Sequence, residues 1–353
     1  MMRLRDKATC WGVDISSSAI KVLALARKKQ RYIVKAYANI ALADDAVVDG
    51  RIEQPAVVAA TLRQAVKLGA CSARNAVIAV PSKAAITKTI ALPAGLSGRE
   101  LEESVLQEAE NHIPYPLSEI RLDFAVLTST ASVDDAMQIL LAASRSEHVD
   151  SRLSVLESAG LKAQRVDIES YSIEHLLPRL LNHLNVGERP TTVALADIGA
   201  KTTSLYVLVN GALVFSREQE FGGHLLSEKM AQYYGLSYAQ AEQQKQRGCL
   251  AADYETAVLA PFKMALAATI SRALQFFFSS SNQYPAIDHL LLTGGSSVLP
   301  GMPSLLSQQT SIPVSLVDPL VDMAVATTVD RQALKQDTPT LLLACALATR
   351  GLL

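Results

Sequence analysis

Apolar and polar residues alternate near the start of the chain in three short runs that are typical of β-strands. The runs cover Trp11–Ile15, Ala19–Leu25 and Tyr32–Ala38, with a serine turn after the first and a basic turn after the second. Strands joined by such short turns predict an antiparallel meander that begins a mixed sheet. The basic turn, Arg27–Arg31, is a solvated hairpin tip in the simplest interpretation, and a contact with acidic lipid is the alternative.

The next segment predicts a helix over Pro55–Leu68, a strand over Ala76–Val80, and then a separate block between Ile86 and Val166. The order of patterns in this block is strand, helix, two strands, helix, strand, so we expect an inserted α/β subdomain. Its first helix begins at Ser97, and Glu100 follows three residues later. This spacing predicts a capping box, in which the two residues satisfy each other's free backbone amides.

One apolar stripe runs along this first helix, because every fourth residue is apolar. The stripe consists of Leu101, Val105, Ala109 and Ile113. Pro114 and Pro116 end the helix, since proline has no amide donor and clashes with the preceding turn. The second helix of the block, Glu147–Ala159, is followed by Gly160, which suits a left-handed C-terminal cap.

The opening pattern returns in the second half of the chain, after a predicted helix over Ser170–Leu184 and a polar loop at Asn185–Pro190. Strands are predicted over Thr192–Ile198, Thr203–Val209 and Ala212–Glu218. In both halves an acid, Asp14 or Asp197, stands near the end of the first strand, and a small polar turn follows it. This duplication predicts two related lobes that face a shared cleft, with the polar loop as the boundary between them.

The rest of the second lobe is predicted to be mostly helical, with a buried strand that runs into two glycines. The expected helices are Gly223–Tyr234, Tyr238–Arg247, about 253–279 and about 338–349, and the expected strands are Asp288–Leu292 and Val314–Val317.

The amino-acid composition argues against some classes of function. Of the 353 residues 49% are apolar and 19% charged, and the formal net charge is −1, which argues against a nucleic-acid binder that works by phosphate neutralisation. The cysteines are scattered without a Cys-x-x-Cys pair, as expected of reduced thiols in a cytosol. They are Cys10, Cys71, Cys249 and Cys345. The six histidines do not form a ligand-like cluster, so no zinc site built from the chain is expected.

No segment is expected to cross a bilayer. The longest candidate, Thr340–Ala348, is far shorter than the roughly 20 apolar residues that a spanning helix needs. The N-terminus, Met1–Thr9, lacks the apolar stretch of a signal peptide. We therefore expect a soluble protein without direct membrane insertion, whose membrane role would depend on a partner.

The two duplicated turns are candidate phosphate-binding loops. Serine and threonine hydroxyls, turn amides and a nearby lysine can all contact phosphate oxygens, and one acid per lobe could hold Mg²⁺ through its waters. Either turn alone would be an ordinary hairpin turn, but their occurrence as a pair favours phosphate binding. The candidate residues are Asp14, Ser16, Ser17, Ser18 and Lys21 in the first lobe, and Asp197, Gly199, Ala200, Lys201, Thr202 and Thr203 in the second.

Two further signals fit a nucleoside. Glu242 and Lys245 lie about one turn apart on a predicted helix, where they could reach a ribose and base or simply form a surface ion pair. Gly294 and Gly295 follow the buried strand and would leave a smooth backbone shelf for a purine or ribose.

Together these motifs resemble the superfamily that includes actin and FtsA, and most specifically the PilM family of type IV pilus assembly proteins. The landmarks that carry the resemblance stand in the order of that family. They are Gly12–Ser17, Ile86–Ile90, Ile113–Leu117, Leu122–Phe124, Val166–Glu169, Asp322–Met323 and the apolar C-terminal helix.

The resemblance implies an α/β protein with the actin-like (ribonuclease H-like) duplicated two-lobe fold and an inserted subdomain of the 1C type. The implied order is lobe I (subdomain 1A), 1C, lobe I again, lobe II (2A), subdomain 2B, lobe II again, and a C-terminal helix that returns to lobe I. The corresponding boundaries are 10–85, 86–166, 167–190, 191–221, 222–286, 287–336 and 337–353.

The resemblance also implies a function. Such a protein would bind ATP and Mg²⁺ between the lobes, with Asp14 and Asp197 near the metal, and act as a cytoplasmic scaffold. It would reach the inner membrane by holding the N-terminal tail of PilN in a groove between subdomains 1A and 1C. The residues expected at the groove are Ala85, Ile86, Thr87, Lys88, Thr89, Leu101 and Val105. The alternative for the helix stripe with Leu101 and Val105 is that it packs on the sheet of its own subdomain.

Several points remain open at this stage. Contacts with the pilus motor ATPases and a homo-oligomer are compatible with the sequence. An actin-fold ATPase or small-molecule kinase is the alternative function, although no residue stands out as the base that a kinase needs. We therefore expect at most slow ATP hydrolysis. A filament-forming protein like FtsA lacks support, because no amphipathic membrane-targeting tail follows the last helix.

Overall fold

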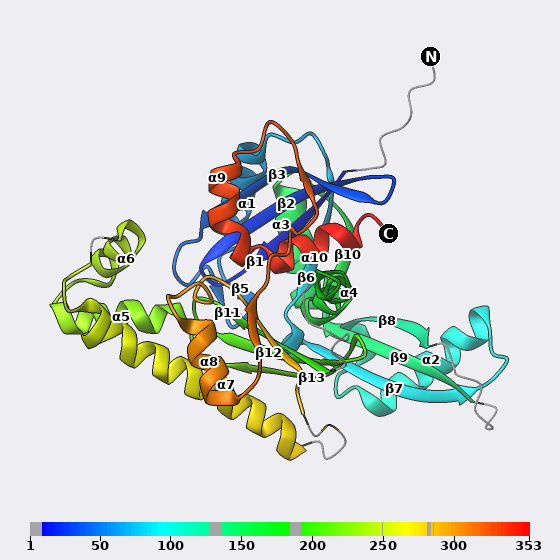
Figure 1. The fold of residues 1–353 in the computed structure, drawn as a ribbon. Helices are drawn as coiled ribbons and strands as arrows, with labels where there is room; N and C mark the ends of the chain where they lie inside the picture. The colour runs from blue at the N-terminus through cyan, green and yellow to red at the C-terminus, as the bar shows by residue number, and fades with distance from the viewer. Residues whose placement is uncertain (1–8, 128–135, 184–191, 249, 281–283, 285) are drawn as a thin grey trace.

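The computed structural model describes residues 9–127, 136–183, 192–248, 250–280, 284 and 286–353. The polar loop predicted as the lobe boundary, Asn185–Pro190, lies outside these residues, as do Cys249 and most of the N-terminal segment predicted not to be a signal peptide. The described chain forms two lobes, each built on one sheet, and a smaller unit beside them (Figure 1).

Lobe I contains a six-stranded sheet with the order β10-β6-β1-β2-β3-β16. The first three strands form the predicted antiparallel meander. β6 pairs with β1, and β10 pairs with β6, both in parallel. The strands are β1 (Cys10–Ile15), β2 (Ala19–Lys28), β3 (Arg31–Ala41), β6 (Asn75–Val80), β10 (Lys162–Ile168) and β16 (Ala324–Val325). A small hairpin, β4 (Val47–Val48) with β5 (Arg51–Ile52), lies outside this sheet.

Lobe II contains a five-stranded sheet with the order β13-β12-β11-β14-β15. Here too three strands form an antiparallel meander, β11-β12-β13, and two parallel strands, β14 and β15, extend the sheet beyond β11. Five strands of lobe I therefore have counterparts in the same order. The strands are β11 (Thr192–Ile198), β12 (Thr203–Val209), β13 (Ala212–Gln219), β14 (His289–Thr293) and β15 (Val314–Leu316). The duplication predicted from the sequence is therefore confirmed at the level of topology.

Two helices lie between the lobes and join them through a shared core. They are α4 (Glu169–Leu181) and α10 (Leu342–Arg350), and their apolar faces pack against β2 of lobe I and against β11 and β12 of lobe II. The last helix lies directly on β1, because a Cβ atom at Gly12 would collide with the backbone oxygen of Ala344. Glycine at this position allows the close approach of helix and strand.

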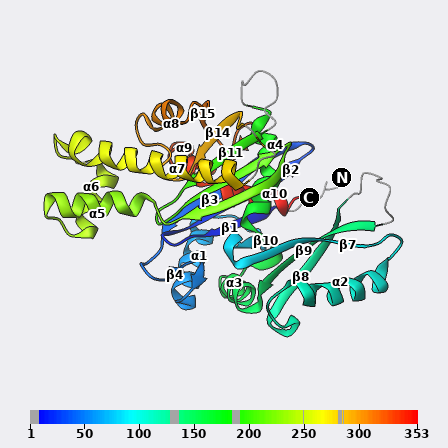
Figure 2. The ribbon, with the colours of Figure 1, turned by 90° about the horizontal axis from the view of Figure 1, so that it is seen from below.

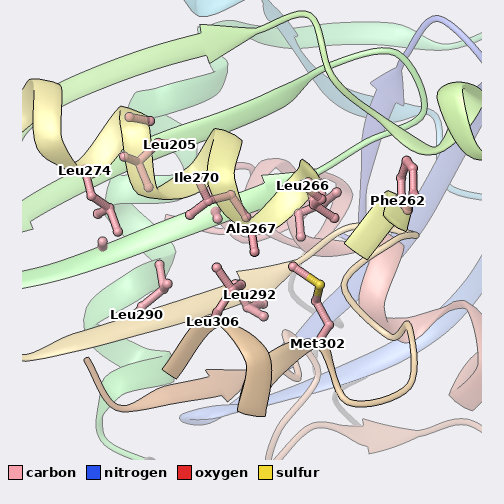
Figure 3. Packing of buried hydrophobic residues seen from close by; sticks show 14 of the residues in the cluster. Leu205, Phe262, Leu266, Ala267, Ile270, Leu274, Leu290, Leu292, Met302 and Leu306 are labelled. Carbon is pink, nitrogen blue, oxygen red and sulfur yellow. The ribbon is translucent and has the colours of Figure 1, made fainter. Parts of the chain in front are cut away.

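The outer helices cover the far faces of the two sheets. In lobe II the long helix α7 packs across β12 and β14, and Figure 3 shows the side chains of this core interdigitating with those of α8. The outer helices are α1 (Pro55–Gly69) and α3 (Ser146–Ser158) on lobe I, α5 (Gly223–Tyr234), α6 (Tyr238–Arg247), the π-helical turn η3 (Glu255–Leu259), α7 (Ala260–Ser280) and α8 (Met302–Thr310) on lobe II, and α9 (Arg331–Asp337) before the short turn η4 (Thr338–Thr340).

The helix that runs through Glu255–Ser280 corrects one expectation, because it is long and apolar enough to cross a membrane by length and composition. Half of its most apolar window is buried inside lobe II, where Phe262, Leu266 and Ile270 are nearly inaccessible to solvent. The same test is passed by core helices of soluble proteins. Its apolar character is thus accounted for by the core that it forms.

The smaller unit is a three-stranded sheet with the order β7-β9-β8, covered on one face by helix α2 (Figure 2). Its elements are β7 (Ala85–Pro93), α2 (Gly98–His112), β8 (Ile120–Leu127) and β9 (Ala136–Arg145), with short turns η1 (Ser82–Ala84) and η2 (Leu117–Glu119). The predicted block 86–166 is longer than this unit. Its last strand, β10, pairs with β6 in the sheet of lobe I, and α3 packs on that lobe too.

Two local predictions for α2 had different outcomes. The apolar stripe is confirmed, because Leu101, Val105 and Ala109 are buried against the sheet of this unit. The capping box is wrong. Ser97 is the N-cap residue, but its side chain accepts no hydrogen bond from the helix. A genuine capping box occurs instead at α6, between Ser237 and Gln240.

Candidate functional site

The first predicted phosphate loop joins β1 to β2 in lobe I. Asp14 stands directly opposite Lys21 in the β1–β2 ladder, and the Lys21 Nζ lies 2.9 Å from the Asp14 Oδ2. Asp14 is only 5% exposed, so this ion pair is largely shielded from water. Between the two residues, the Ser16 side chain and amide both donate hydrogen bonds to the Ala19 carbonyl, which holds the serine turn in shape.

The second predicted loop is its counterpart in lobe II. The Gly199 amide donates to the Thr202 carbonyl at 2.9 Å and closes the turn, while the Thr203 hydroxyl donates to the Phe221 carbonyl. The loop also caps helix α5, because the Gly223 amide donates to the Gly199 carbonyl at 3.0 Å and the next amide donates to Ala200. The loop after Asp197 is therefore held against the start of α5.

The acids of the two loops, Asp14 and Asp197, interact electrostatically with each other and with Lys21. Burial raises the pKa of Asp197 to about 6, the charge of Lys21 opposes this shift, and the charge of Asp14 adds to it. Burial alone would lower the pKa of Lys21, but the neighbouring carboxylates outweigh it and raise that pKa. Asp14, Lys21 and Asp197 therefore lie close enough to influence one another's charge.

Glu169 interacts electrostatically with Lys21 and Asp14, although no sequence pattern assigns it a chemical role. It is the first residue of α4, directly after β10. Burial raises its pKa to about 8, the charge of Asp14 adds to this shift, and Arg152 opposes it. The only available signal was its position in the landmark Val166–Glu169, because no spacing rule connects it with Asp14.

Three acids surround a single lysine here, so the cluster carries excess negative charge whenever the acids ionise. Such a donor set fits a divalent cation with oxygen ligands. Among the described residues, however, no group of three or more metal-ligating side chains is arranged to enclose a metal ion. A cation at this place would need oxygens from water or from a phosphate to complete its shell.

Glu242 and Lys245 form an ion pair of 2.6 Å on α6. The pair is half-buried against α5, where the Lys245 Nζ lies 2.6 Å from the Ser227 hydroxyl and 3.4 Å from the Gly223 carbonyl. It is therefore more than a solvated surface pair. Through Gly223 it is linked to the second predicted phosphate loop.

Gly294 and Gly295 lie where β14 ends, beside Asp197. Gly294 has a φ of 88°, and a Cβ atom there would lie 2.5 Å from the Asp197 Oδ1. Gly295 differs, since the nearest atom to a Cβ built on it is a Thr340 methyl carbon at 3.8 Å. The first glycine allows the strand end to approach the acid, and the second is exposed and would tolerate a Cβ atom.

Five of the residues predicted for the partner groove, Ala85–Thr89, lie on the edge strand β7. Two cavities flank it. One of about 200 Å³ lies between lobe I and the smaller unit and is lined by Ile86, Ile113 and Tyr115. Three basic residues, Arg51, Lys83 and Arg145, also line it, and so does His148, whose pKa is lowered by burial.

The other cavity, of about 340 Å³, lies between β7 and the edge strand β13 of lobe II. Ala85 and Thr87 line it, and Glu169 lies in its wall. The alternation of side chains along β7 thus sends Ile86 to one cavity and its neighbours to the other.

The other predicted groove residues lie elsewhere. Lys88 and Thr89 are exposed but line neither cavity. Leu101 and Val105 pack in the core beneath α2, so the expectation that their side chains line a groove does not hold in this structure. Their apolar stripe is used to cover the sheet of the smaller unit.

A family model described as type IV pilus assembly protein PilM matches residues 12–352, which is nearly the whole chain. The chain belongs to the PilM family. A solved PilM–PilN type IV pilus biogenesis complex has a similar fold, with a TM-score of 0.78 and 27% identity over 99% of this chain and 99% of that chain. The fold is accordingly the actin-like one, as the sequence predicts.

Another group of relatives has a different name. The ethanolamine utilization protein EutJ of Salmonella typhimurium is 29% identical over 162 residues, and that of Escherichia coli is 30% identical over the same length. Each match covers 45% of this chain and 50% of the relative, so the chain spans about half the length of the curated relatives it matches. A solved EutJ from Carboxydothermus hydrogenoformans, with a TM-score of 0.57 and 15% identity over 96% of this chain and 88% of that one, shows a likeness of fold.

Proposed function

We propose that this PilM-family protein is an ATP-binding scaffold of type IV pilus assembly, and that it holds the N-terminal tail of a PilN-type partner beside β7. The observation that carries the ATP site is the convergence of Asp14, Lys21 and Asp197 from the ends of duplicated strands. In this proposal one turn would lie on each side of a triphosphate.

Each part of the site would then have a task. The hydroxyls and amides of Ser16–Ser18 and of Gly199–Thr203 would contact phosphate oxygens, with Lys21 as a counter-charge. Glu242 and Lys245 would face the ribose, and the backbone of Gly294–Gly295 would support the base. Asp14 and Asp197 would orient the waters of a magnesium ion, which usually keeps most of its hydration shell. The ion would supply charge neutralisation for the phosphates.

The tail would lie in the cavity between lobe I and the smaller unit. The apolar side chains of Ile86 and Ile113 help to line that cavity, so it suits an extended peptide with apolar side chains. The solved PilM–PilN complex, whose fold this chain shares, supports this choice of partner. Recruitment through such a tail would place the protein in the cytoplasm at the inner membrane. Contacts with motor ATPases or a second copy are not needed for this proposal.

The ATP site is tested by calorimetric titration of Mg·ATP into the wild type and into Asp197→Ala. We expect the variant to lose at least about tenfold in affinity, because removing a charged partner in a shielded site costs on the order of 1.5–3 kcal/mol. Asp318→Ala, which removes an acid from the loop after β15, serves as the matched control. Equal ATP affinity of wild type and Asp197→Ala, with both folded, would refute the site.

A metabolic enzyme of the same fold is the second candidate. Glu169 is the residue that could favour it, since a carboxyl with a pKa near 8 can exchange a proton at neutral pH. It lies in the wall of the larger cavity, beside β13. Rapid phosphate release in the presence of a sugar or small acid would support the enzyme and count against the scaffold.

A further inference from the structure

The charged side chains of the β2–β3 hairpin are all basic. Between Ala19 and Ala41 the sequence contains six lysines and arginines and not a single acid, although the whole chain is nearly balanced with 33 basic and 34 acidic residues. Lys21 is paired with Asp14 at the cleft end of the hairpin. The other five cations gather toward the opposite end, and they are Arg27, Lys28, Lys29, Arg31 and Lys35.

Four of these five cations are accessible to a partner. Lys28, Lys29, Arg31 and Lys35 are all exposed, and none of the four forms an ion pair with another residue that the structure describes. One acid, Asp322, comes two residues before β16, which pairs with β3 next to the tip, and it is engaged by His183, with 3.0 Å between the His183 Nδ1 and the carboxylate. A solvated surface normally mixes charges of both signs, and this hairpin does not.

The backbone presents the cations in fixed positions. Lys28 pairs with Arg31 across a two-residue tip, and Lys29 sits in that tip with a φ of 57°, a conformation that costs a non-glycine residue energy. Lys35 is the extra residue where the ladder shifts register, between the pairs Ala24–Ala36 and Leu25–Val34. The hairpin stands out from lobe I near the C-terminus (Figure 1).

An aromatic residue stiffens the base of this tip. The guanidinium carbon of Arg27 lies 5.8 Å from the centre of the Tyr32 ring, and that of Arg179 from α4 lies 4.7 Å from it. Cation–π contacts of this kind tie the hairpin to the helix between the lobes. The ring is thereby occupied and is not available for stacking on a nucleic-acid base.

We propose that the β2–β3 hairpin docks this protein on an anionic bilayer surface through lipid phosphate headgroups. Clusters of four to eight cations are typical of such contacts. Diffuse headgroup charge demands no shape complementarity, so a convex tip without a groove suits it. A nucleic acid would call for a basic groove and stacking platforms, which the hairpin does not offer. The contact needs neither ATP nor a partner's tail, so it goes beyond the proposed function.

The contact would be reversible by itself. Each Lys or Arg held at an anionic surface contributes on the order of fivefold in partitioning, and salt screens the attraction over about 10 Å. The hairpin and a partner's tail bound elsewhere on the protein would act together. Once one of the two contacts with the membrane has formed, the other becomes intramolecular. The hairpin would then fix the orientation of the lobes relative to the membrane.

Vesicle co-sedimentation of the full-length protein tests this proposal. The hairpin variant carries Lys28→Gln, Lys29→Gln and Arg31→Gln together. A matched control removes the same charge from exposed sites elsewhere, with Lys67→Gln, Lys162→Gln and Lys335→Gln. On vesicles of phosphatidylglycerol and phosphatidylcholine we expect the hairpin variant to bind at least about tenfold more weakly than the wild type, and the control to change by less than about twofold. Binding to phosphatidylcholine alone should be negligible.

Thermal melting of both variants checks that they remain folded. Two results would overturn the proposal. One is a wild type that does not bind anionic vesicles, including the case in which it binds a short DNA duplex or an acidic protein surface instead. The other is an equal loss of vesicle binding in the hairpin variant and in the control, which would show an effect of net charge alone.

Discussion

Replacement of Glu169 by glutamine should make the protein more stable at high pH. Burial and the charge of Asp14 raise the pKa of this carboxyl to about 8 in the folded state, against an ordinary value of 4.5. Between these values the unfolded chain loses the proton while the folded protein keeps it. The free energy of unfolding therefore falls as pH rises, by at most about 1.4 kcal/mol for each pH unit.

The magnitude follows from the two pKa values. Integrated from pH 4.5 to 8, the loss has a ceiling of about 5 kcal/mol. Water reaches the wall of the cavity in which Glu169 lies, and the site can relax, so we expect about 2 kcal/mol at pH 9. Glutamine keeps the shape but cannot ionise. The variant should gain this amount over the wild type above pH 8 and match it below pH 5.

The assay is urea unfolding at a series of pH values from 5 to 9, with thermal midpoints as a second measure. Glu157→Gln, an exposed acid on the neighbouring helix α3, provides the control and should leave the pH dependence unchanged. If the difference between wild type and Glu169→Gln were the same at every pH, Glu169 would ionise normally and the proposed crowding of acids in the cleft would be refuted.

Other predictions test the site and its chemistry. Gly294→Ala should weaken Mg·ATP binding by at least about tenfold, because its Cβ would lie 2.5 Å from the Asp197 Oδ1. Gly301→Ala is the control, since Gly301 has a φ of 75° but open space around it. It should cost only about 1 kcal/mol of stability and leave ATP binding unchanged. Phosphate release from ATP should stay below about 1 s⁻¹, and a faster steady rate would contradict the scaffold. Phe262→Ala should lower the free energy of unfolding by about 3–5 kcal/mol in a denaturant titration, because the side chain is fully buried in lobe II, and a loss below about 1 kcal/mol would contradict that packing.

Much of the fold could be predicted because the signals were local. The strands of both meanders follow from the alternation of apolar and polar residues and from the short turns between them. The acid at the end of the first strand of each meander indicated that the two meanders are duplicates. Helix α5 begins and ends where the pattern predicts, at Gly223 and Tyr234. In such segments the sequence period and the tertiary environment favour the same structure.

The boundary of the inserted unit could not be predicted, because strand pairing is a long-range choice. The pattern over Glu147–Val166 is that of a helix and a strand, and nothing local says which sheet the strand joins. In the structure β10 pairs with β6, and Arg152 on α3 holds this arrangement with hydrogen bonds to the Ala79 and Gly50 carbonyls. These contacts place α3 and β10 in lobe I.

The candidate site could be predicted where the same residue type stands at equivalent positions of the two duplicated halves, as Asp14 and Asp197 do. Glu169 had no such counterpart, and only the start of α4 brings it near Asp14. The groove prediction failed for Leu101 and Val105 for a related reason. A sequence stripe states that one helix face is apolar, but not whether the protein's own sheet or a partner covers it.

The central claim is that a partner's tail binds in the cavity beside β7 while ATP binds between the lobes. Calorimetric titration of a PilN-type N-terminal tail peptide into the wild type, Ile86→Glu and Thr89→Glu tests it most directly. Ile86 lines that cavity, and Thr89 lies on the same strand but outside it. We expect Ile86→Glu to lose peptide binding and to keep the ATP affinity of the wild type, and Thr89→Glu to bind both ligands normally. Full peptide binding by a folded Ile86→Glu variant would contradict the account.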